Sequence, residues 1–152
     1  MQNIVWKDSQ GDIRITTIVD ETIPMDAHEN RLAQDMSYDG FVAVGRNLDM
    51  PDDKLWRGAW TVVDGAVVVA LDKARANFRA MLRMARAPKL SALDVAYMQA
   101  LERGDGEKQT EIVAEKQRLR DVTKMPEIES AQTVDDLRAV WPQDFPSIEA
   151  VG

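Results

Sequence analysis

The fold is decided by Asp72-Lys-Ala-Arg-Ala-Asn-Phe-Arg-Ala-Met-Leu-Arg-Met-Ala-Arg-Ala-Pro88 and its continuation to Asp121. Ala, Leu, Met, Glu, Lys, Gln and Arg dominate this stretch, and these residues have the highest helix propensities. Asp72 is placed to cap a long first helix, and Pro88 either kinks that helix or begins a new one. Apolar residues recur at helical spacing along it: Leu71, Ala74, Phe78, Met81, Leu82 and Ala85, then Leu90, Leu93, Tyr97 and Leu101.

Two glycines, Gly104 and Gly106, are expected to end this helical segment. A further helix follows from Glu107 to Asp121, with Ile112, Val113 and Leu119 as its narrower apolar face. Two helices joined by so short a glycine-containing connection are expected to fold back as an αα-hairpin. Folding about residue 105 would place Glu111 near Gln99 and Glu115 near Val95. A last short helix is predicted from an N-cap at Thr133-x-x-Asp136 to Val140.

The residues before this helical stretch have the pattern of strands and turns. Segments 3–7 and 12–19 are rich in β-branched residues and lie on either side of the turn Ser9-Gln-Gly-Asp12, so they predict a hairpin. Residues 40–44 predict a third strand. Asp64-Gly65 lies between Thr61-Val-Val63 and Ala66-Val-Val-Val69, which predicts a second, tight hairpin with positive φ at Gly65. Asp26-x-x-Glu29 has the spacing of a capping box and predicts a short helix to about Met36.

Together these patterns predict an α+β protein. A small antiparallel β-rich N-terminal lobe is expected over residues 1–70, followed by a helical C-terminal lobe over residues 71–152. The reason for this boundary is the abrupt change at Leu71 from β-branched, period-two patterns to strong helix formers.

Charge and composition narrow the class of protein. The chain has 152 residues, no cysteine and a net charge of −7. Residues 1–70 carry a net charge of −6 and residues 104–152 one of −5, whereas residues 71–103 carry +4. An acidic protein with one basic helix is a poor nucleic-acid binder, because phosphate contacts need a dominant positive surface. Neither a signal peptide nor a membrane-spanning run is visible. The absence of cysteine fits synthesis in the cytoplasm.

No catalytic or metal-binding constellation is apparent. His28 is the only histidine and lies near Asp26, Glu29 and Asp35, but it lacks the convergent partners that metal and catalytic sites need. Asp49, Asp52 and Asp53 lack the spacing of a calcium loop, and no glycine-rich phosphate loop follows a strand. We therefore expect no enzymatic activity, no metal and no cofactor.

Two sets of side chains remain as candidates for binding a partner. One is a basic row on the first long helix: Arg75, Arg79, Arg83 and Arg86. Its default interpretation is a solvated helix face; the alternatives are contact with the acidic tail or with a partner. The other set is the tryptophans Trp6, Trp56, Trp60 and Trp141, which either pack the core or include interface anchors.

Several segments together resemble the tail fibre assembly proteins and related tail assembly chaperones of tailed phages and prophages. The segments are Leu55-Trp-Arg-Gly-Ala-Trp60, Asp72-Lys-Ala-Arg75, Arg86-Ala-Pro-Lys-Leu-Ser-Ala-Leu-Asp-Val-Ala-Tyr-Met-Gln-Ala-Leu101, Lys116-Gln-Arg-Leu-Arg-Asp-Val122 and Thr133-Val-Asp-Asp-Leu-Arg-Ala-Val-Trp-Pro142. The resemblance implies a non-enzymatic helper that binds a phage tail fibre subunit and assists its folding or trimerisation. It also implies action in the host cytoplasm during assembly, with retention on the virion tail as a further possibility.

On this interpretation we expect the partner to contact Trp56, Arg57 and Trp60, with Asp52 and Asp53 of the preceding loop pairing with a basic fibre tip. Two alternatives stay open. The protein could be a permanent structural component of the tail or baseplate, or a small phage regulator that inhibits a host factor through its acidic surface. The oligomeric state is not predicted.

Overall fold

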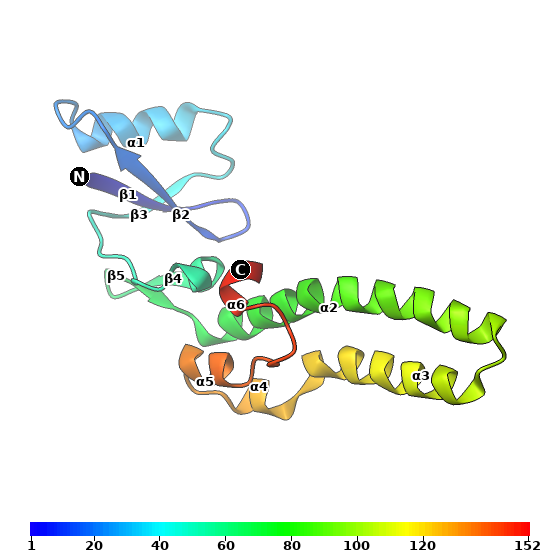
Figure 1. The fold of residues 1–152 in the computed structure, drawn as a ribbon. Coiled ribbons are helices and arrows are strands. Elements are labelled where there is room, and N and C mark those ends of the chain that lie inside the picture. Colours follow the sequence, from blue (N-terminus) through cyan, green and yellow to red (C-terminus); the bar gives the residue numbers. More distant parts are fainter. The chain divides into compact units, whose positions relative to one another are not determined.

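A computed structural model describes all 152 residues (Figure 1). A small antiparallel β region at the N-terminus precedes a helical C-terminal part, so the predicted α+β class is confirmed. The chain divides into two compact units, residues 1–73 (unit 1) and residues 74–152 (unit 2). The division falls within the first turn of the long helix that the sequence places after residue 70.

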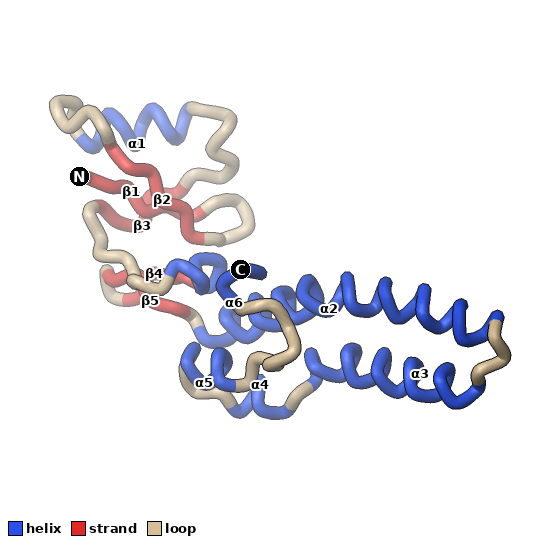
Figure 2. Tube along the Cα trace, in the orientation of Figure 1, coloured by secondary structure: helices blue, strands red, loops and turns tan.

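Unit 1 contains a three-stranded antiparallel sheet of β1 (Gln2–Lys7), β2 (Ile13–Ile18) and β3 (Val42–Arg46), in the order β2-β1-β3 (Figure 2). The predicted β1–β2 hairpin is therefore confirmed. Asp8 closes its turn, because its carboxylate accepts the backbone N–H groups of Gln10 and Asp12 and pairs with Arg14. These hydrogen bonds hold the pKa of Asp8 below its usual value.

The third strand begins two residues later than expected, at Val42. Gly40 has a φ of +67°, and the Ser9 N–H donates to the Asp39 carbonyl, so residues 39–40 form a turn beside the β1–β2 connection. A Cβ at Gly40 would lie 2.6 Å from the Ser9 backbone. The close approach of two backbones, rather than strand pairing, therefore sets the conformation here.

The helix α1 (Met25–Gln34) forms, but the predicted capping box at Asp26 and Glu29 is wrong. The N-cap is Pro24, which has no side-chain hydrogen bond to offer, and the helix ends at Gln34 rather than near Met36. Asp26 and Glu29 both bind Arg46 of β3 instead. The hydrogen bond from Arg46 lowers the pKa of Glu29.

The second hairpin consists of β4 (Trp60–Val63) and β5 (Ala66–Val69), preceded by the 3-10 helix η1 (Lys54–Ala59). Its two turn residues have positive φ, +49° at Asp64 and +78° at Gly65. This is the geometry of the tight hairpin turn that Asp-Gly favours, so the prediction is confirmed.

Apolar side chains on both faces of β1 build the interior of unit 1. Because successive residues of a strand point to opposite faces, Ile4 and Trp6 pack with Ile18 and Leu32 in one cluster. Val5 packs on the other side in a second cluster with Ile13, Trp60 and Val67. The sheet is thus buried on two faces, with α1 supplying Leu32 to one cluster and the β4–β5 hairpin contributing to the other.

The first long helix, α2 (Leu71–Glu102), continues through Pro88 without interruption, so Pro88 does not begin a new helix. Asp72 lies in its first turn rather than at the N-cap. Gly104, with a φ of +68°, follows the end of α2 as expected, but Gly106 opens the next helix, α3 (Gly106–Asp121). The side chain of Asp105 caps α3 by accepting the Lys108 N–H.

The predicted αα-hairpin is confirmed, and the chain folds back about residue 105. Lys116 of α3 pairs with Asp94 of α2 at 2.5 Å and lies 5.2 Å from the Tyr97 ring. This register is the one expected from a turn centred at that position. The hairpin buries a stripe that includes Leu82, Ala85, Ala100, Ile112 and Leu119.

Short helices complete unit 2: η2 (Val122–Lys124), α4 (Pro126–Ser130), α5 (Val134–Ala139) and α6 (Ile148–Val151). Thr133 and Asp136 form a reciprocal capping box at the start of α5, as predicted. Trp141 lies between Phe78 and Phe145, and its indole N–H donates to the Pro146 carbonyl at 2.8 Å. This tryptophan therefore packs unit 2 internally.

The basic row of α2 is largely engaged within unit 2, so the interpretation as a solvated face is wrong. Arg75 donates to the Ala131 carbonyl, Arg79 to the Thr123 carbonyl and Glu129, and Arg86 to the Leu119 and Arg120 carbonyls. Arg86 thereby satisfies carbonyls in the last turn of α3, where a helix also attracts positive charge. Arg83 is exposed.

Candidate functional site

Of the three predicted partner-binding residues, only Arg57 lies on the surface. Trp56 is 0% exposed and Trp60 1% exposed. Trp60 packs against Val5, Ile13 and Val67 within unit 1. Neither indole is accessible to a partner in this structure, so the two tryptophans are core residues and not the interface anchors that were expected. Both indole Nε1 atoms are buried without a hydrogen-bond partner.

The surface over Trp60 is basic rather than acidic. The Lys54 ammonium lies 5.3 Å and the Arg57 guanidinium 5.8 Å from the centre of the Trp60 ring. Neither cation has a carboxylate partner, whereas Arg14 and Arg46 in the same unit are paired. Asp53, which was expected to face a basic fibre tip, accepts the Leu55 N–H at the start of η1 instead. The available charge at this position is therefore positive.

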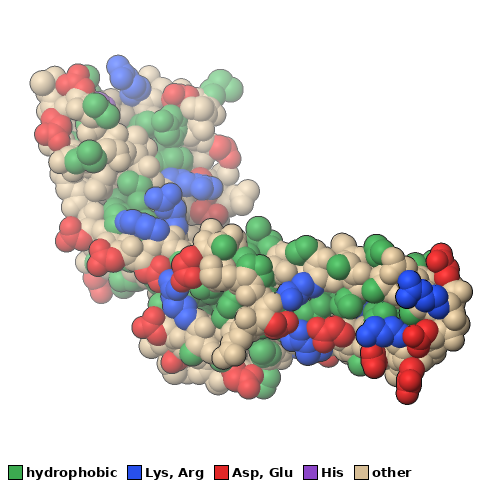
Figure 3. Space-filling view, in the orientation of Figure 1, with side chains coloured by type: hydrophobic (Ala, Val, Ile, Leu, Met, Phe, Trp, Pro, Cys, Tyr) green, Lys and Arg blue, Asp and Glu red, His purple; other side chains and the backbone are tan.

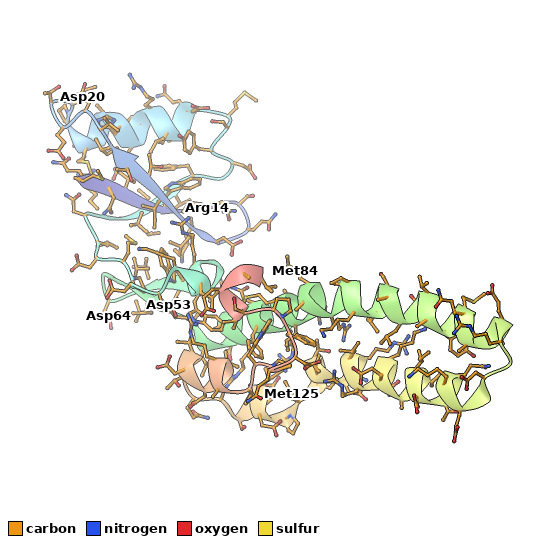
Figure 4. The ribbon with its side chains drawn as sticks, viewed as in Figure 1. Arg14, Asp20, Asp53, Asp64, Met84 and Met125 are labelled. Atoms are coloured by element: carbon orange, nitrogen blue, oxygen red, sulfur yellow. The ribbon has the colours of Figure 1, made fainter.

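A group of Lys and Arg side chains is visible on this face of unit 1, between the three-stranded sheet and the β4–β5 hairpin (Figure 3). Arg14 of β2, which Figure 4 labels, lies in the same area. Arg57 lines one hollow together with Arg14 and another together with Lys54. Because Arg14 is held by Asp8, the cations without a carboxylate partner here are Lys54 and Arg57.

The strand β2 presents an open edge, since it pairs only with β1. Asn3 of β1 uses both backbone groups on its β3 side, where its N–H donates to the Asn47 side chain and its carbonyl accepts the Asn47 N–H. In an antiparallel ladder its partner Thr17 must then direct its own N–H and carbonyl away from β1. By the same alternation, Ile13 and Ile15 do so too.

Two hollows lie along this edge, and both involve η1. The larger, of about 600 Å³, is lined by Asp12 to Thr17 together with Trp6, Tyr38, Arg57 and Gly58. The smaller, of about 270 Å³, includes Ile15, Thr17, Lys54, Arg57 and Trp60 among its lining residues. Ile15, Thr17 and Arg57 belong to both. We call this feature the β2 groove, defined by Ile13, Ile15 and Thr17 on one side and by Lys54, Arg57 and Gly58 on the other.

The β2 groove combines the two elements that bind an extended peptide. Outward-facing N–H and carbonyl groups can pair with an added strand, and adjacent side chains then select its sequence. Unpaired strand edges are usually blocked in proteins because they attract other chains. Here the edge is left open beside two unpaired cations, which favour a peptide that carries a carboxylate.

The opposite edge of the sheet, at β3, is less suited to pairing with an added peptide strand. Its pairing with β1 is irregular, with a shift in register between Val5 and Trp6. Such bulges twist a strand and interrupt regular pairing. No cation pair comparable to Lys54 and Arg57 lies beside it, because Arg46 at its end is held by Asp26 and Glu29.

His28 lies apart from the β2 groove, on α1. Its Nε2 atom is 3.1 Å from the Asp20 carbonyl oxygen. Hydrogen bonds from Thr22 hold the pKa of Asp20 below its usual value. No group of three or more His, Asp or Glu side chains is placed to share a metal ion.

Sequence reasoning identified Arg57 but missed Lys54 and the edge of β2. The order of strands in a sheet is a tertiary property, and the β-branched pattern of residues 13–18 is the same at an edge as in the centre. The nearby Asp-rich loop suggested an acidic surface, because nothing in the sequence shows that Asp53 turns inward to cap η1.

None of the helices has the length and apolar character required to cross a membrane. Comparisons of the chain with protein-family models, with curated proteins and with solved structures give no significant match.

Proposed function

We propose that this protein is a non-enzymatic assembly chaperone for a phage tail fibre subunit. It holds an extended, carboxylate-bearing segment of that subunit in the β2 groove until the subunit folds or trimerises. The resemblance of residues 55–60, 72–75, 86–101, 116–122 and 133–142 to tail fibre assembly proteins supports the identity of the partner. The β2 groove supports the mode of binding.

The observation that carries the proposal is the open backbone of Ile13, Ile15 and Thr17 beside unpaired Arg57. Each backbone hydrogen bond to an added strand contributes a net of about 0.5–1.5 kcal/mol, so a few such bonds and one ion pair give a reversible complex. Reversibility is what a chaperone needs, because the bound segment must be released into the final assembly.

The proposal also has a physical rationale on the side of the partner. Subunits that become ordered only in a multimer expose unpaired strand edges and apolar surface beforehand, and such surfaces aggregate. A groove that pairs temporarily with one exposed segment lowers the concentration of aggregation-prone chains. No chemical step is required of the chaperone.

The test is co-expression with the product of the adjacent fibre gene, followed by affinity pull-down and an assay for soluble fibre trimer. We expect Lys54→Glu combined with Arg57→Glu to weaken capture at least about tenfold, because both charges that attract the carboxylate are reversed. Asp52→Ala is the matched control, since Asp52 lies in the same loop region but does not line either hollow. Circular dichroism should show that all variants stay folded.

Trp60→Ala is unsuitable for this purpose, because it removes a core residue and would reduce binding through unfolding. If soluble trimer forms equally well without the protein and no complex is recovered, the chaperone proposal fails. Stoichiometric presence of the protein in purified virions, without an effect on trimer formation, would instead favour a permanent structural component.

A further inference from the structure

The outward face of α2 carries an uncharged surface that the αα-hairpin does not cover. It consists of Ala80, Met84, Ala87, Ser91, Val95 and Met98, and all six are exposed. The three larger side chains are 63% (Met84), 60% (Val95) and 54% (Met98) exposed. Met84, labelled in Figure 4, lies on the side of α2 that faces away from α3. We call this surface the α2 seam.

The spacing within the α2 seam is four, three, four, four and three residues. Alternating steps of three and four align side chains along one side of a helix in the manner of a coiled coil. Three of the six residues are small (Ala80, Ala87, Ser91), which leaves gaps that the ridges of a second helix can enter. At 1.5 Å per residue the seam is about 27 Å long. Its shape therefore fits another helix.

We infer that the helix covering the α2 seam is α2 of a second copy of this protein, packed antiparallel. Consider a two-fold axis that crosses the α2 seam at the level of residue 89 along the helix. It would place Ala80 opposite Met98 of the second copy, and Ala87 opposite its Ser91. Ala80 then meets Met98 at each end of the seam, Met84 lies opposite Val95, and the small residues Ala87 and Ser91 meet near the centre, where the helices can approach closely. Every seam residue thus faces a seam residue of the other copy.

Charge supports the same arrangement. Arg83, beside the seam, is exposed and has no hydrogen-bond or ion-pair partner, and the Asp94 side chain is 68% exposed although it pairs with Lys116. In the antiparallel register Arg83 of each copy lies next to Asp94 of the other. A parallel pair would instead hold the two Arg83 side chains on opposite sides of the interface and at the same level, so neither would meet Asp94 of the other copy.

The first test is the mass of the full chain in solution, measured by sedimentation velocity over a concentration series. We expect a reversible dimer. Ala87→Glu should raise the dissociation constant at least about tenfold, because it buries two carboxylates near the two-fold axis. Ala114→Glu is the matched control, since Ala114 is an exposed alanine of α3 outside the seam, and it should leave the dimer intact. A monomer at every concentration would overturn the inference.

The second test fixes the direction of packing, and it uses the absence of cysteine from the chain. Ala80→Cys and Met98→Cys are about 27 Å apart on one helix, so they cannot form a disulfide within one copy. In the antiparallel dimer the double variant should form a covalent dimer on oxidation, whereas each single variant should not. Efficient cross-linking of the single variants would indicate a parallel pair and would overturn the proposed register.

Discussion

The arginines of the two units are used differently. In unit 1, Arg14 and Arg46 pair with carboxylates at the surface, and Lys54 and Arg57 have no carboxylate partner at all. In unit 2, three arginines of α2 donate to main-chain carbonyls that lie 33 to 56 residues further along the chain. The regular basic row is thus structural, because it ties the end of α3 and the segments after it to α2.

Charge spacing alone therefore does not identify a binding surface. The four arginines of α2 form the most conspicuous charge pattern in the sequence. Three of them nevertheless donate to main-chain carbonyls at or near the ends of helices, where carbonyls lack a partner within the helix. The two cations beside Trp60 follow no pattern, and they remain available to a partner.

Removing the Trp60 side chain should have the largest effect on unit 1. Trp60→Ala empties a site enclosed by Val5, Ile13 and Val67, and we expect a loss of about 3–5 kcal/mol in the free energy of unfolding. Urea titration followed by far-UV circular dichroism measures the loss. Helical signal should persist in part after unit 1 unfolds, because Leu82, Leu119 and Leu137 are buried in unit 2.

Val63→Ala is the control for that change, since Val63 lies in the same strand and is 51% exposed. It should alter stability by less than about 0.5 kcal/mol. If Trp60→Ala abolished all helical structure in one cooperative step, the two units would not have separate cores.

In unit 2, among the arginines of the basic row, substitution of Arg86 should cause the largest loss of stability. Arg86→Met removes hydrogen bonds to the Leu119 and Arg120 carbonyls, and we expect a loss of about 1.5–3 kcal/mol. Arg83→Met is the matched control three residues away, and it should change stability by less than about 0.5 kcal/mol. Thermal unfolding at low protein concentration keeps self-association out of the measurement. Equal losses in both variants would show that the row stabilises the fold only through its net charge.

Substitutions at two glycines, one in each unit, should have different effects on the free energy of unfolding. Gly65→Val should cost about 1 kcal/mol or more, because Gly65 has a φ of +78° that a β-branched residue resists. Gly106→Ala in unit 2 should be neutral or slightly stabilising, since Gly106 is helical and has open space around it. Differential scanning calorimetry of both variants measures the contrast. An unchanged unfolding temperature for Gly65→Val would contradict the assigned turn.

The smallest expected effect concerns acid stability. Hydrogen bonds from Arg118 hold the pKa values of Glu115 and Asp144 below their usual 4.5 and 3.8. A carboxylate with a lowered folded-state pKa stabilises the protein above its usual pKa, and this contribution is lost as the pH falls through the lower value. Arg118→Gln should therefore unfold at a lower temperature than the unmodified protein at pH 7, and the difference should shrink below about pH 4. A difference independent of pH would contradict this linkage.

Features that depend on a few adjacent residues were predictable from the sequence. Asp64-Gly65 specifies its own turn, and Thr133 with Asp136 specifies its own cap, because all the interacting groups lie within four residues. The capping box at Asp26 failed although its spacing was right, since Arg46 competes for both carboxylates from 17 to 20 residues away. The β2 groove was unpredictable for a similar reason: it requires the strand order and the position of η1 beside β2.

Hydrogen exchange of the backbone amides would show directly whether a fibre subunit pairs with the open edge of β2. Exchange is measured for the free protein and in the presence of the fibre subunit, with the Lys54→Glu and Arg57→Glu double variant as the control. We expect peptides covering residues 13–18 to exchange more slowly when the subunit is present. The double variant should lose this protection, and α3 should be unaffected. Unchanged exchange in residues 13–18, or protection confined to α2 and α3 while the subunit is bound, would contradict this mode of binding.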